Sequence, residues 1–577
     1  MVIDILDPLT EYANVYEKRF AEVAKSTFDE LAAEAQVDEK ANLQTCTQIY
    51  KEENKLSALK KRIKHRKIGR VLLWLGIIGV IIYVLVAYQD MEAKWLVFAA
   101  VTIVFALVYI FAVLNPTLKE MKSAGQKLEY GIIQLKEIAW KQMRPLLRLY
   151  DWDILTRMIM KTVPKIEFDP YFTTKRLADL KATYHWNESF NEGRSVLFSH
   201  SGLINGNPFV ICRTRKMVMG TMTYKGTKTI SWTTTESDGN GRTRTVHHSE
   251  VLRATVTAPY PEYPETTHLI YGNTAAPNLM FYRKKSGLAN KEDSLSYKWK
   301  RRSLRKKARD LKNANYAMMT NEEFEVIFNT SNRNDNQQYA LLFTPLAQEN
   351  MTKILKDTYY GYGDDFNFYK ERMINIIEAD HMQELNLDMD PREYYHFDFR
   401  YAKIQFLGFN KMYFRAIYFA LAPLLSIPMY QQIRPQEAIY GRDMEQHSSF
   451  WEHEAIANFW GQKHFQHPDC VTKCVLKTDE VRTSNDSATL TVHAYGYRAE
   501  KRISYISVHG GDGRWHDVPV EWYEYFPVEG SGQLHLTEDN LFKDGGNITN
   551  RERREHIDSV LNQTSMMNYR RHIASRV

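Results

Sequence analysis

The residues that come closest to a chemical site by type and spacing are His464, His467, Cys470 and Cys474. Two imidazoles and two thiolates can hold a zinc ion tetrahedrally. The Cys-x3-Cys spacing differs from that of a zinc knuckle, however. The sequence from 471 to 477 also has the pattern of a strand, in which residues 470 and 474 would lie ~13 Å apart. We therefore predict exposed loop histidines and core thiols here, and no zinc site.

Two other segments resemble catalytic motifs without completing them. His453-Glu454 begins the His-Glu-x-x-His pattern of zinc hydrolases, but Ala457 occupies the second histidine position. Ser199 and Ser201 lie in the segment Phe-Ser-His-Ser-Gly, which is not the Gly-x-Ser-x-Gly nucleophile elbow. Neither segment supports assigning a catalytic residue.

Acidic and glycine-rich patterns give the same result. Asp388, Asp390 and Glu393 could bind a divalent ion, but an acidic loop around Pro391 explains them better. The chain has no Gly-x-x-x-x-Gly-Lys-Ser/Thr loop and no Gly-x-Gly-x-x-Gly. We predict no catalytic, cofactor-binding or metal-binding residue. An enzyme with another motif remains the alternative.

One segment stands out by charge. Residues 298–312 predict a basic helix that a single acid, Asp310, offsets. A solvated surface helix is the plain interpretation. The functional alternatives are contact with an anionic leaflet, at ~1 kcal/mol per basic residue near the surface, or with nucleic-acid phosphates. Only Tyr297 and Trp299 could stack on bases, which disfavours nucleic acid. The basic residues are Lys298, Lys300, Arg301, Arg302, Arg305, Lys306, Lys307, Arg309 and Lys312.

The position of this helix matters because the chain has two membrane-like segments. Val71–Tyr88 and Trp95–Leu114 are uncharged apolar runs of 18 and 20 residues. Each approaches the ~20 residues that cross a bilayer as a helix. A polar hexapeptide, 89–94, separates them, so we predict an antiparallel transmembrane hairpin whose second helix ends at Pro116.

The charges beside the two runs predict their orientation. Residues 55–70 hold eight basic residues and no acid, and three lysines follow the second run before residue 128. The connecting loop has one lysine and two acids. The positive-inside rule therefore predicts a multi-pass cell-membrane protein with both termini in the cytosol.

Helical periodicity dominates both sides of this hairpin. Residues 1–70 predict amphipathic helix, and residues 118–143 repeat the pattern, with Pro145 near the end. We expect the two helical segments to pair as an antiparallel stalk, or short coiled coil. From about residue 165 the pattern becomes that of strands.

The clearest strand signal is a long hairpin. Residues 218–236 alternate, with Met222, Tyr224, Ile230 and Trp232 in one register, and 237–241 form a glycine-rich turn. The second strand covers 242–256, and prolines at 259, 261 and 264 predict its end.

The remaining elements are predicted more coarsely. Residues 324–328 predict a strand and Pro345 the start of a helix, while 412–430 suits a buried or interfacial segment too short to span a bilayer. In the C-terminal part we predict a helix at 452–460 and strands near 471–477, 488–495 and 501–508. We also predict a hairpin turn at 510–513, alternation at 518–522, and a helical charged tail from Arg551.

Length and composition set the fold class. The chain has 577 residues, 44% hydrophobic and 25% charged, with a net charge of +7 and four cysteines. These values exclude a disordered chain and a disulfide scaffold. We predict a membrane-anchored α+β protein, in which a helical stalk and transmembrane helical hairpin precede a β-rich cytosolic body. The predicted domains are 1–70, 71–114, 115–164, 165–435 and 436–577.

This layout resembles an uncharacterised family of bacterial membrane proteins with two spans. Residues 166–171 with 195–198, and residues 324–328 with 340–345, carry the likeness, which covers about residues 10–380. The family has no assigned activity, so the resemblance implies architecture only.

The function that these observations predict is a non-enzymatic scaffold or binding module at the cytosolic face of a membrane. The alternative is a membrane-tethered enzyme, with or without a metal. The expected partners are the lipid bilayer, anionic lipid at residues 298–312 and an unidentified protein. Nucleic acid is disfavoured.

Overall fold

The computed structural model describes residues 4–87, 93–237, 243–310, 316–435, 447–484, 487–538 and 566–576. The chain forms two compact units. The helical unit comprises Ser26–Tyr150 and Pro391–Phe409, and the body comprises Met1–Lys25, Asp151–Asp390 and Asn410–Val577. The predicted helical tail from Arg551 lies largely outside the described residues, and the prediction is wrong for residues 566–576, which form two short strands.

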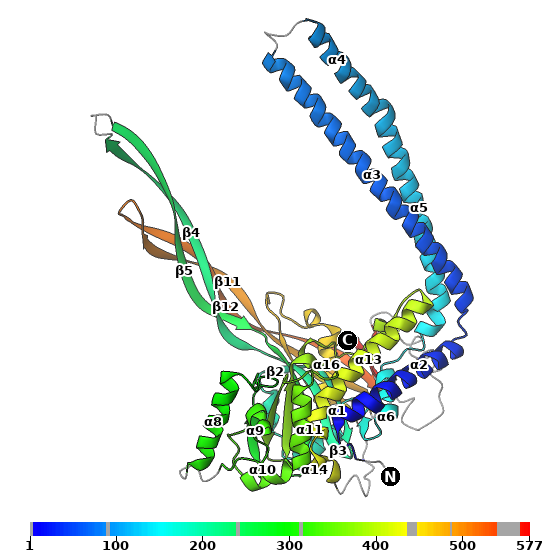
Figure 1. Cartoon of the computed structure of the whole chain (residues 1–577), viewed down its shortest axis with the longest axis vertical. Coiled ribbons are helices and arrows are strands. Elements are labelled where there is room, and N and C mark those ends of the chain that lie inside the picture. The colour runs from blue at the N-terminus through cyan, green and yellow to red at the C-terminus, as the bar shows by residue number, and fades with distance from the viewer. Residues whose placement is uncertain are drawn as a thin grey trace. The chain divides into compact units, whose positions relative to one another are not determined.

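The helical unit is built around two long helices, which run side by side in Figure 1. The first, α3, is one uninterrupted helix of 49 residues that joins the predicted basic segment to the first apolar run. The second consists of three consecutive segments. The elements are α3 (Glu39–Ala87), α4 (Ala93–Val108), the π-helical turn η2 (Tyr109–Leu114), α5 (Asn115–Leu147) and the 3₁₀ turn η5 (Pro391–Tyr394).

The prediction that Pro116 ends the second apolar helix is wrong. The helix passes through a π-helical turn, and Pro116 then lies in the first turn of α5. Proline removes one backbone hydrogen bond from a helix interior, and here the helix continues in spite of that loss, with the irregular turn η2 directly before the proline. The second helix therefore continues beyond the apolar run.

The predicted antiparallel pairing of the helical segments is confirmed for α3 and α5, whereas residues 1–25 belong to the body. Lys136 Nζ lies 2.7 Å from Glu53 Oε1, and Lys60 Nζ lies 2.7 Å from Glu129 Oε1, so positions rise along α3 as they fall along α5. The two helices also share a small apolar core, which contains Cys46, Ile49, Ile132 and Ala139.

Both long helices carry a segment that is long and apolar enough to cross a membrane. The two segments lie within Glu39–Val86 and Ala93–Leu147, and only 6% of each apolar window is buried in the protein. The large side chains that stay exposed include Leu85, Val86 and Phe105. These are the two runs that the sequence identifies.

The body contains a seven-stranded antiparallel sheet with the order β1-β2-β3-β6-β9-β8-β7. Strands that are neighbours in the sequence mostly pair as hairpins, as β2 does with β3 and β8 with β9. The strands are β1 (Ile166–Phe168), β2 (Arg194–Ile204), β3 (Asn207–Lys216), β6 (Glu265–Gly272), β7 (Met280–Arg283), β8 (Phe366–Glu371) and β9 (Ile374–Ala379).

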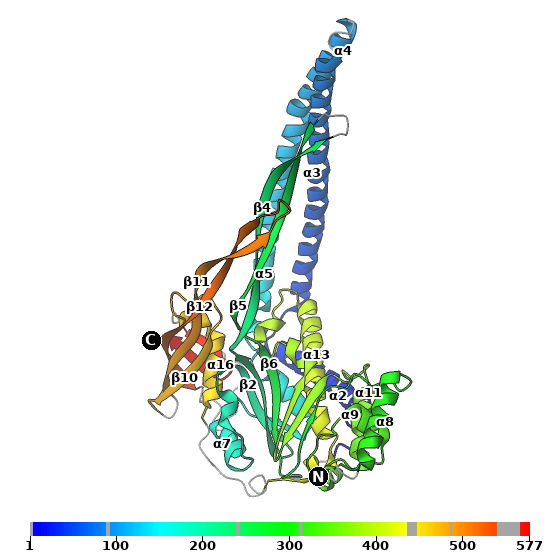
Figure 2. The same cartoon turned by 90° about the vertical axis from the view of Figure 1, so that its left-hand side faces the viewer.

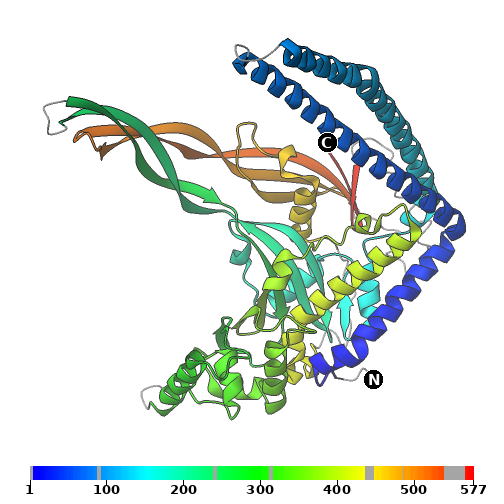
Figure 3. The same cartoon turned by 45° about the horizontal axis from the view of Figure 1, so that its top comes forward.

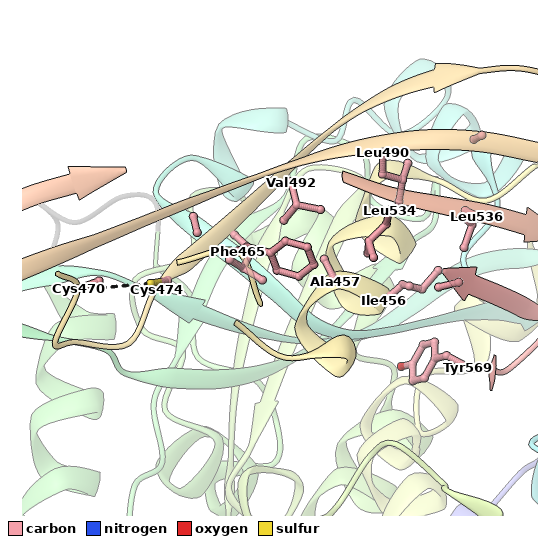
Figure 4. Packing of buried hydrophobic residues seen from close by; sticks show 14 of the residues in the cluster. Ile456, Ala457, Phe465, Cys470, Cys474, Leu490, Val492, Leu534, Leu536 and Tyr569 are labelled. Carbon is pink, nitrogen blue, oxygen red and sulfur yellow. Dashed lines mark hydrogen bonds between the residues drawn. The ribbon is translucent and has the colours of Figure 1, made fainter. Parts of the chain in front are cut away.

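A second antiparallel sheet has the order β10-β11-β12-β14-β13. Its inner face packs Leu490, Val492 and Leu534 against Ile456 of α16, as Figure 4 shows. The two predicted strands at 488–495 and 501–508 form one strand, β11. The strands are β10 (Val475–Arg482), β11 (Ser487–His509), β12 (Trp515–Glu538), β13 (Met566–Tyr569) and β14 (His572–Arg576).

The predicted long hairpin is confirmed as a two-stranded ribbon, β4 (Val218–Ser237) with β5 (Thr243–Glu262). Its predicted turn lies mostly outside the described residues. The prolines do not end the second strand: Pro259 pairs with Thr221 and Pro261 with Met219. In a two-stranded ribbon each strand has an open edge, where a missing N–H breaks no ladder bond.

The ribbon packs on the outer part of the β11–β12 hairpin, and the two run side by side in Figures 1 and 3. Ile230 and Leu252 bury themselves against Val518 and Val520. A Cβ on Gly226 would lie 2.1 Å from the carbonyl oxygen of Pro519, so only glycine permits this close approach.

Short helices surround the sheets of the body. The prediction of a strand at 324–328 is wrong, because these residues form helix α9. Asn321 caps it by accepting a hydrogen bond from the Phe324 N–H, and three glutamates occupy its first turn. The helix predicted at Pro345 is confirmed as α11, and that at 452–460 as α16.

The segment 412–430 is a core segment of the body. Phe414 stacks on Phe20 with ring centroids 4.2 Å apart, and the hydroxyl of Tyr418 donates to the carbonyl of Pro8. Residues 416–427 are buried. The prediction of a buried segment is therefore confirmed.

The helices of the body are α1 (Pro8–Glu11), η1 (Tyr12–Tyr16), α6 (Ile154–Thr162), α7 (Thr174–Ala182), η3 (Glu188–Asn191), α8 (Leu295–Arg309), α9 (Glu322–Phe328), α10 (Asn336–Leu342), α11 (Pro345–Lys356), α12 (Asp380–Glu384), α14 (Pro428–Gln432), α16 (Phe450–Trp460) and η6 (Gln462–His464). Helices α2 (Glu17–Glu34) and α13 (Phe399–Leu425) are divided between the units.

Candidate binding surfaces of the body

Cys470 and Cys474, for which the sequence predicts no zinc site, lie close together. The Sγ atoms of Cys470 and Cys474 are 3.6 Å apart, as the dashed line in Figure 4 marks. The prediction that they lie ~13 Å apart in a strand is wrong, because β10 begins only at Val475 and the preceding loop folds both thiols over Gly496. Burial raises the pKa of Cys474 to about 12, so its thiol is protonated at neutral pH.

The two histidines do not join this pair. His464 is exposed, and the Nδ1 of His467 accepts a hydrogen bond from the Asp469 N–H. Among the described residues, no group of three or more His, Cys, Asp or Glu side chains is arranged to hold a metal ion.

His453 has a different role from the one its motif suggests. It is fully buried, its Nε2 lies 2.9 Å from Ser448 Oγ, and that hydroxyl donates to Glu538 Oε1 at 3.0 Å. Burial lowers the pKa of His453 to about 3, so the ring is neutral. A serine and a histidine in contact could act as nucleophile and base. Because all three side chains are buried, we interpret this group as structural.

Ser199 and Ser201 are also held inside the body. Ser199 Oγ donates to Glu452 Oε2 at 3.0 Å, and Ser201 Oγ donates to Asp169 Oδ2 at 2.6 Å. Arg570 neutralises Glu452 at 3.2 Å, with both side chains almost fully buried. These contacts join β2, α16 and the end of the chain.

The acidic candidate of the sequence consists of Asp388, Asp390 and Glu393. Asp388 and Asp390 belong to the body, whereas Glu393 belongs to the helical unit. Burial raises the pKa of Asp388. Within the part of the chain that the structure describes, these three carboxylates do not form a group arranged to hold a metal ion.

The predicted basic helix is confirmed as α8, which lies beside α9, as Figure 2 shows. Ser294 caps it by accepting from the Tyr297 N–H, and Tyr297 and Leu304 anchor its inner face. Lys312 lies outside the described residues.

The basic residues of α8 differ in their surroundings, and some of them face the body. Burial lowers the pKa of Lys300, Lys307 bonds the carbonyl of Ser331, and Arg305 forms a two-pronged ion pair with Glu322. These contacts turn part of the charge towards the body.

The opposite face of α8 is free. Leu295 and Trp299 are 86% and 76% exposed, and they continue into a row of exposed cations spaced three and four residues apart. Such spacing places side chains on one helical face. We call this row the outer stripe: Leu295, Trp299, Arg302, Lys306 and Arg309. Its cations have no ion-pair partner among the described residues.

A second exposed surface lies on the β11–β12 hairpin. Opposite the buried Val518 and Val520, the alternate positions expose Ile503, Tyr505 and Trp515, at 50%, 67% and 70%. They lie along one face of the hairpin and are not shown to form one contiguous patch, so we assign no role to this surface.

Comparison with known proteins adds no assignment. No family model, no curated protein and no solved structure matches this chain. The family resemblance over residues 10–380 therefore stays a prediction.

The sequence shows that α8 is basic, but it does not show which face of the helix is exposed. The spacing of Leu295 and Trp299 relative to the cations is visible in the sequence. Which face is free depends on how Tyr297 and Leu304 pack when α8 docks beside α9, the next described helix in the chain. The exposed face of the β11–β12 hairpin depends in the same way on its packing against the β4–β5 ribbon.

Proposed function

We propose that the protein is a membrane-anchored, non-enzymatic scaffold or binding module, with both termini in the cytosol, whose body contacts anionic lipid through the outer stripe of α8. The observation that carries this proposal is the combination on one free helical face of two exposed apolar side chains and three unpaired cations.

Anchoring by α3 and α4 is supported by the exposure of their apolar segments. Side chains such as Val86 and Phe105 are 83% and 76% exposed, and almost nothing in the protein covers the two segments. In water, burial of such surface is worth ~25 cal/mol per Å². A lipid bilayer supplies that burial, and the cationic residues before position 71 suit the cytosolic side.

Lipid fits the outer stripe better than nucleic acid does. A tryptophan beside cations is the composition of membrane-surface helices, where the indole lies at headgroup level and the cations attract anionic lipid. At ~1 kcal/mol per cation, the stripe cations and the exposed Lys298 would together contribute about 4 kcal/mol. Single-stranded nucleic acid would need several stacking platforms, and the stripe has one.

The test is a fluorescence measurement on the full chain. We would attach an environment-sensitive dye to Ser303→Cys, an exposed position beside the stripe, since the four native cysteines are buried. The protein would be reconstituted in lipid discs of neutral or partly anionic phospholipid. We expect a blue shift in anionic discs that salt weakens, because the attraction is screened beyond ~8 Å at physiological ionic strength.

The variant and its control differ only in where the charge is removed. The variant changes Lys298, Arg302, Lys306 and Arg309 to glutamine. The control changes four other exposed cations that have no ion-pair partner among the described residues: Lys161, Lys225, Arg253 and Lys463.

The variant should lose the blue shift and the control should keep it. An unchanged shift in the variant, or an equal shift in neutral discs, would contradict lipid contact by α8. Added anionic vesicles serve as a second arm, because they can reach α8 whether or not it faces the disc. Competition by duplex DNA at low concentration would favour nucleic acid instead.

A further inference from the structure

A groove of about 570 Å³ lies against the outer face of the five-stranded sheet, remote in sequence from α8. This volume falls within the range of about 300–1,000 Å³ that small-molecule sites occupy. Its walls are mainly apolar and include Met217, Tyr495, Tyr497 and Pro527.

Strand register fixes the arrangement of the walls. Tyr495 and Tyr497 are alternate residues of β11 and share one face of the sheet, where Glu529 lies opposite the first and Pro527 opposite the second. The Tyr497 hydroxyl donates to the sulfur of Met217 at 3.6 Å. Two tyrosines and one carboxylate are therefore held side by side on rigid strands.

The charges around the groove are unequally compensated. Lys477 lies 3.0 Å from buried Glu454, and its ammonium also donates to the carbonyl of Asn191 at 2.8 Å, so this cation has its own partners. Glu529, in contrast, shares the imidazole of His493 with Asp479, at 3.1 and 3.2 Å. Two carboxylates on one imidazole leave this end of the groove negative whatever the charge of the ring.

We propose that this groove binds a free small organic cation with an apolar body, such as a tertiary or quaternary ammonium compound. The apolar body would pack against Met217 and Pro527. The cation would lie beside Glu529 and over the face of Tyr495, where cation–π attraction contributes ~0.5–2 kcal/mol. This proposal concerns a surface separate from α8 and does not depend on the lipid contact.

The test uses the full chain in discs of phospholipids without choline, because a choline headgroup has the same chemistry and would compete. Benzyltrimethylammonium is titrated in by calorimetry, and choline and its uncharged analogue 3,3-dimethylbutan-1-ol are compared as competitors. We expect saturable binding of the ammonium probe and displacement by choline at concentrations at least about tenfold lower than by the alcohol, a difference of ~1.4 kcal/mol.

Three variants sharpen the result. Glu529→Gln should weaken binding at least about tenfold, and Tyr495→Ala about 2- to 30-fold. Glu521→Gln removes an exposed carboxylate from the same strand outside the groove, so the affinity should stay within about twofold of the wild type.

No saturable binding, equal displacement by the alcohol, or an unchanged affinity of Glu529→Gln would overturn the proposal. Occupation only in discs that contain phosphatidylcholine would also overturn it, since the ligand would then be a lipid headgroup and not a free cation.

Discussion

The helical unit and the body differ in where they keep their ion pairs. In the helical unit, Lys60 and Glu129 are 61% and 45% exposed, and the pair holds the surface of a helical seam. In the body, Arg333 and Glu325 are both fully buried, as are Arg570 and Glu452 to within 2%. The body also has ion pairs at its surface, such as Arg305 with Glu322, but it adds these fully buried pairs, whereas the pair Lys60–Glu129 of the helical unit lies in water.

This difference predicts unequal tolerance to change. An exposed pair contributes ~0–1 kcal/mol, because water and salt screen it and its side chains lose entropy. A buried charge that loses its partner costs ~3–5 kcal/mol, because nothing replaces the water it gave up on folding. The stability of the body should therefore depend on a few polar side chains, and that of the helical unit on its apolar seam.

The largest effect is expected for Arg570→Met. The change leaves Glu452 buried and unpaired, so we expect the body to lose ~3–5 kcal/mol of its free energy of unfolding. Hydrogen exchange of peptides from β2, α16 and β14, measured on the full chain, would report it. Arg570→Met combined with Glu452→Gln should recover part of the loss. A loss below ~1 kcal/mol in the single variant would end the contrast between the units.

Mild acid should discriminate between the units next most strongly. Burial lowers the pKa of His200 and His453 to about 3, and that of His572 well below its usual value, so the folded body keeps three neutral rings that the unfolded chain protonates near pH 6.5. Their contribution is present above pH 6.5 and is lost as pH falls towards the folded pKa. Glu452 and Glu454 act in the opposite sense, because burial raises their pKa values, that of Glu454 to about 7.

Three imidazoles that bind a proton only on unfolding, set against one or two carboxyl groups that release one, leave the unfolded chain with one or two more bound protons than the folded body. We therefore expect the body to lose roughly 1–3 kcal/mol per pH unit below pH 6.5, measured by hydrogen exchange corrected for its intrinsic pH dependence. His572→Phe should reduce this slope by about 1.4 kcal/mol per unit, since both ring nitrogens of His572 lack a partner among the described residues. Equal slopes for α5 and α16 peptides would contradict the prediction.

One substitution made in both units should give opposite signs. Gly226→Ala forces a Cβ to 2.1 Å from the Pro519 carbonyl and should cost ~1–3 kcal/mol by separating the β4–β5 ribbon from β12. Gly131→Ala in α5 has no atom within 4 Å of its new Cβ and should stabilise the helix by up to ~1 kcal/mol. Exchange of ribbon and α5 peptides would measure both. Destabilisation by both changes would mean that the helical unit is packed as closely as the body.

The two units also differ in how far the sequence predicts them. Periodicity predicts the pairing of α3 and α5, both apolar segments, the β4–β5 ribbon and α16, because each depends on contacts along one element or between neighbours. Helix α9 is mispredicted as a strand because its apolar residues, which include Phe324 and Phe328, do not keep to one face of the helix. The helical period is therefore not visible in the sequence. The caps that identify it, Asn321 and the following glutamates, are a weaker signal than alternation.

The candidate surfaces are predicted less well than the fold. The basic composition of α8 is evident from the sequence, but its free face is set by contacts with residues such as Glu322 and Ser331. The groove brings together Met217, Lys477, Tyr497 and Glu529 from four separate segments, which no local pattern joins. The contact between Cys470 and Cys474 depends on a glycine from another strand, Gly496.

The smallest effect is expected where the helical unit loses an ion pair. Lys136 and Glu53 join α5 to α3 at 2.7 Å, but both side chains are more than a third exposed. Lys136→Gln should therefore change the free energy of unfolding by less than ~0.5 kcal/mol, and raising the salt concentration should remove even that difference. Exchange of α3 and α5 peptides at low and high salt would measure it. A loss of more than ~1 kcal/mol that persists in high salt would show that this pair is shielded from water, as the buried ion pairs of the body are. The apolar contact between Ile49 and Ile132 would then not be enough to hold α3 on α5. The distinction between the two units would in that case have to rest on other buried side chains.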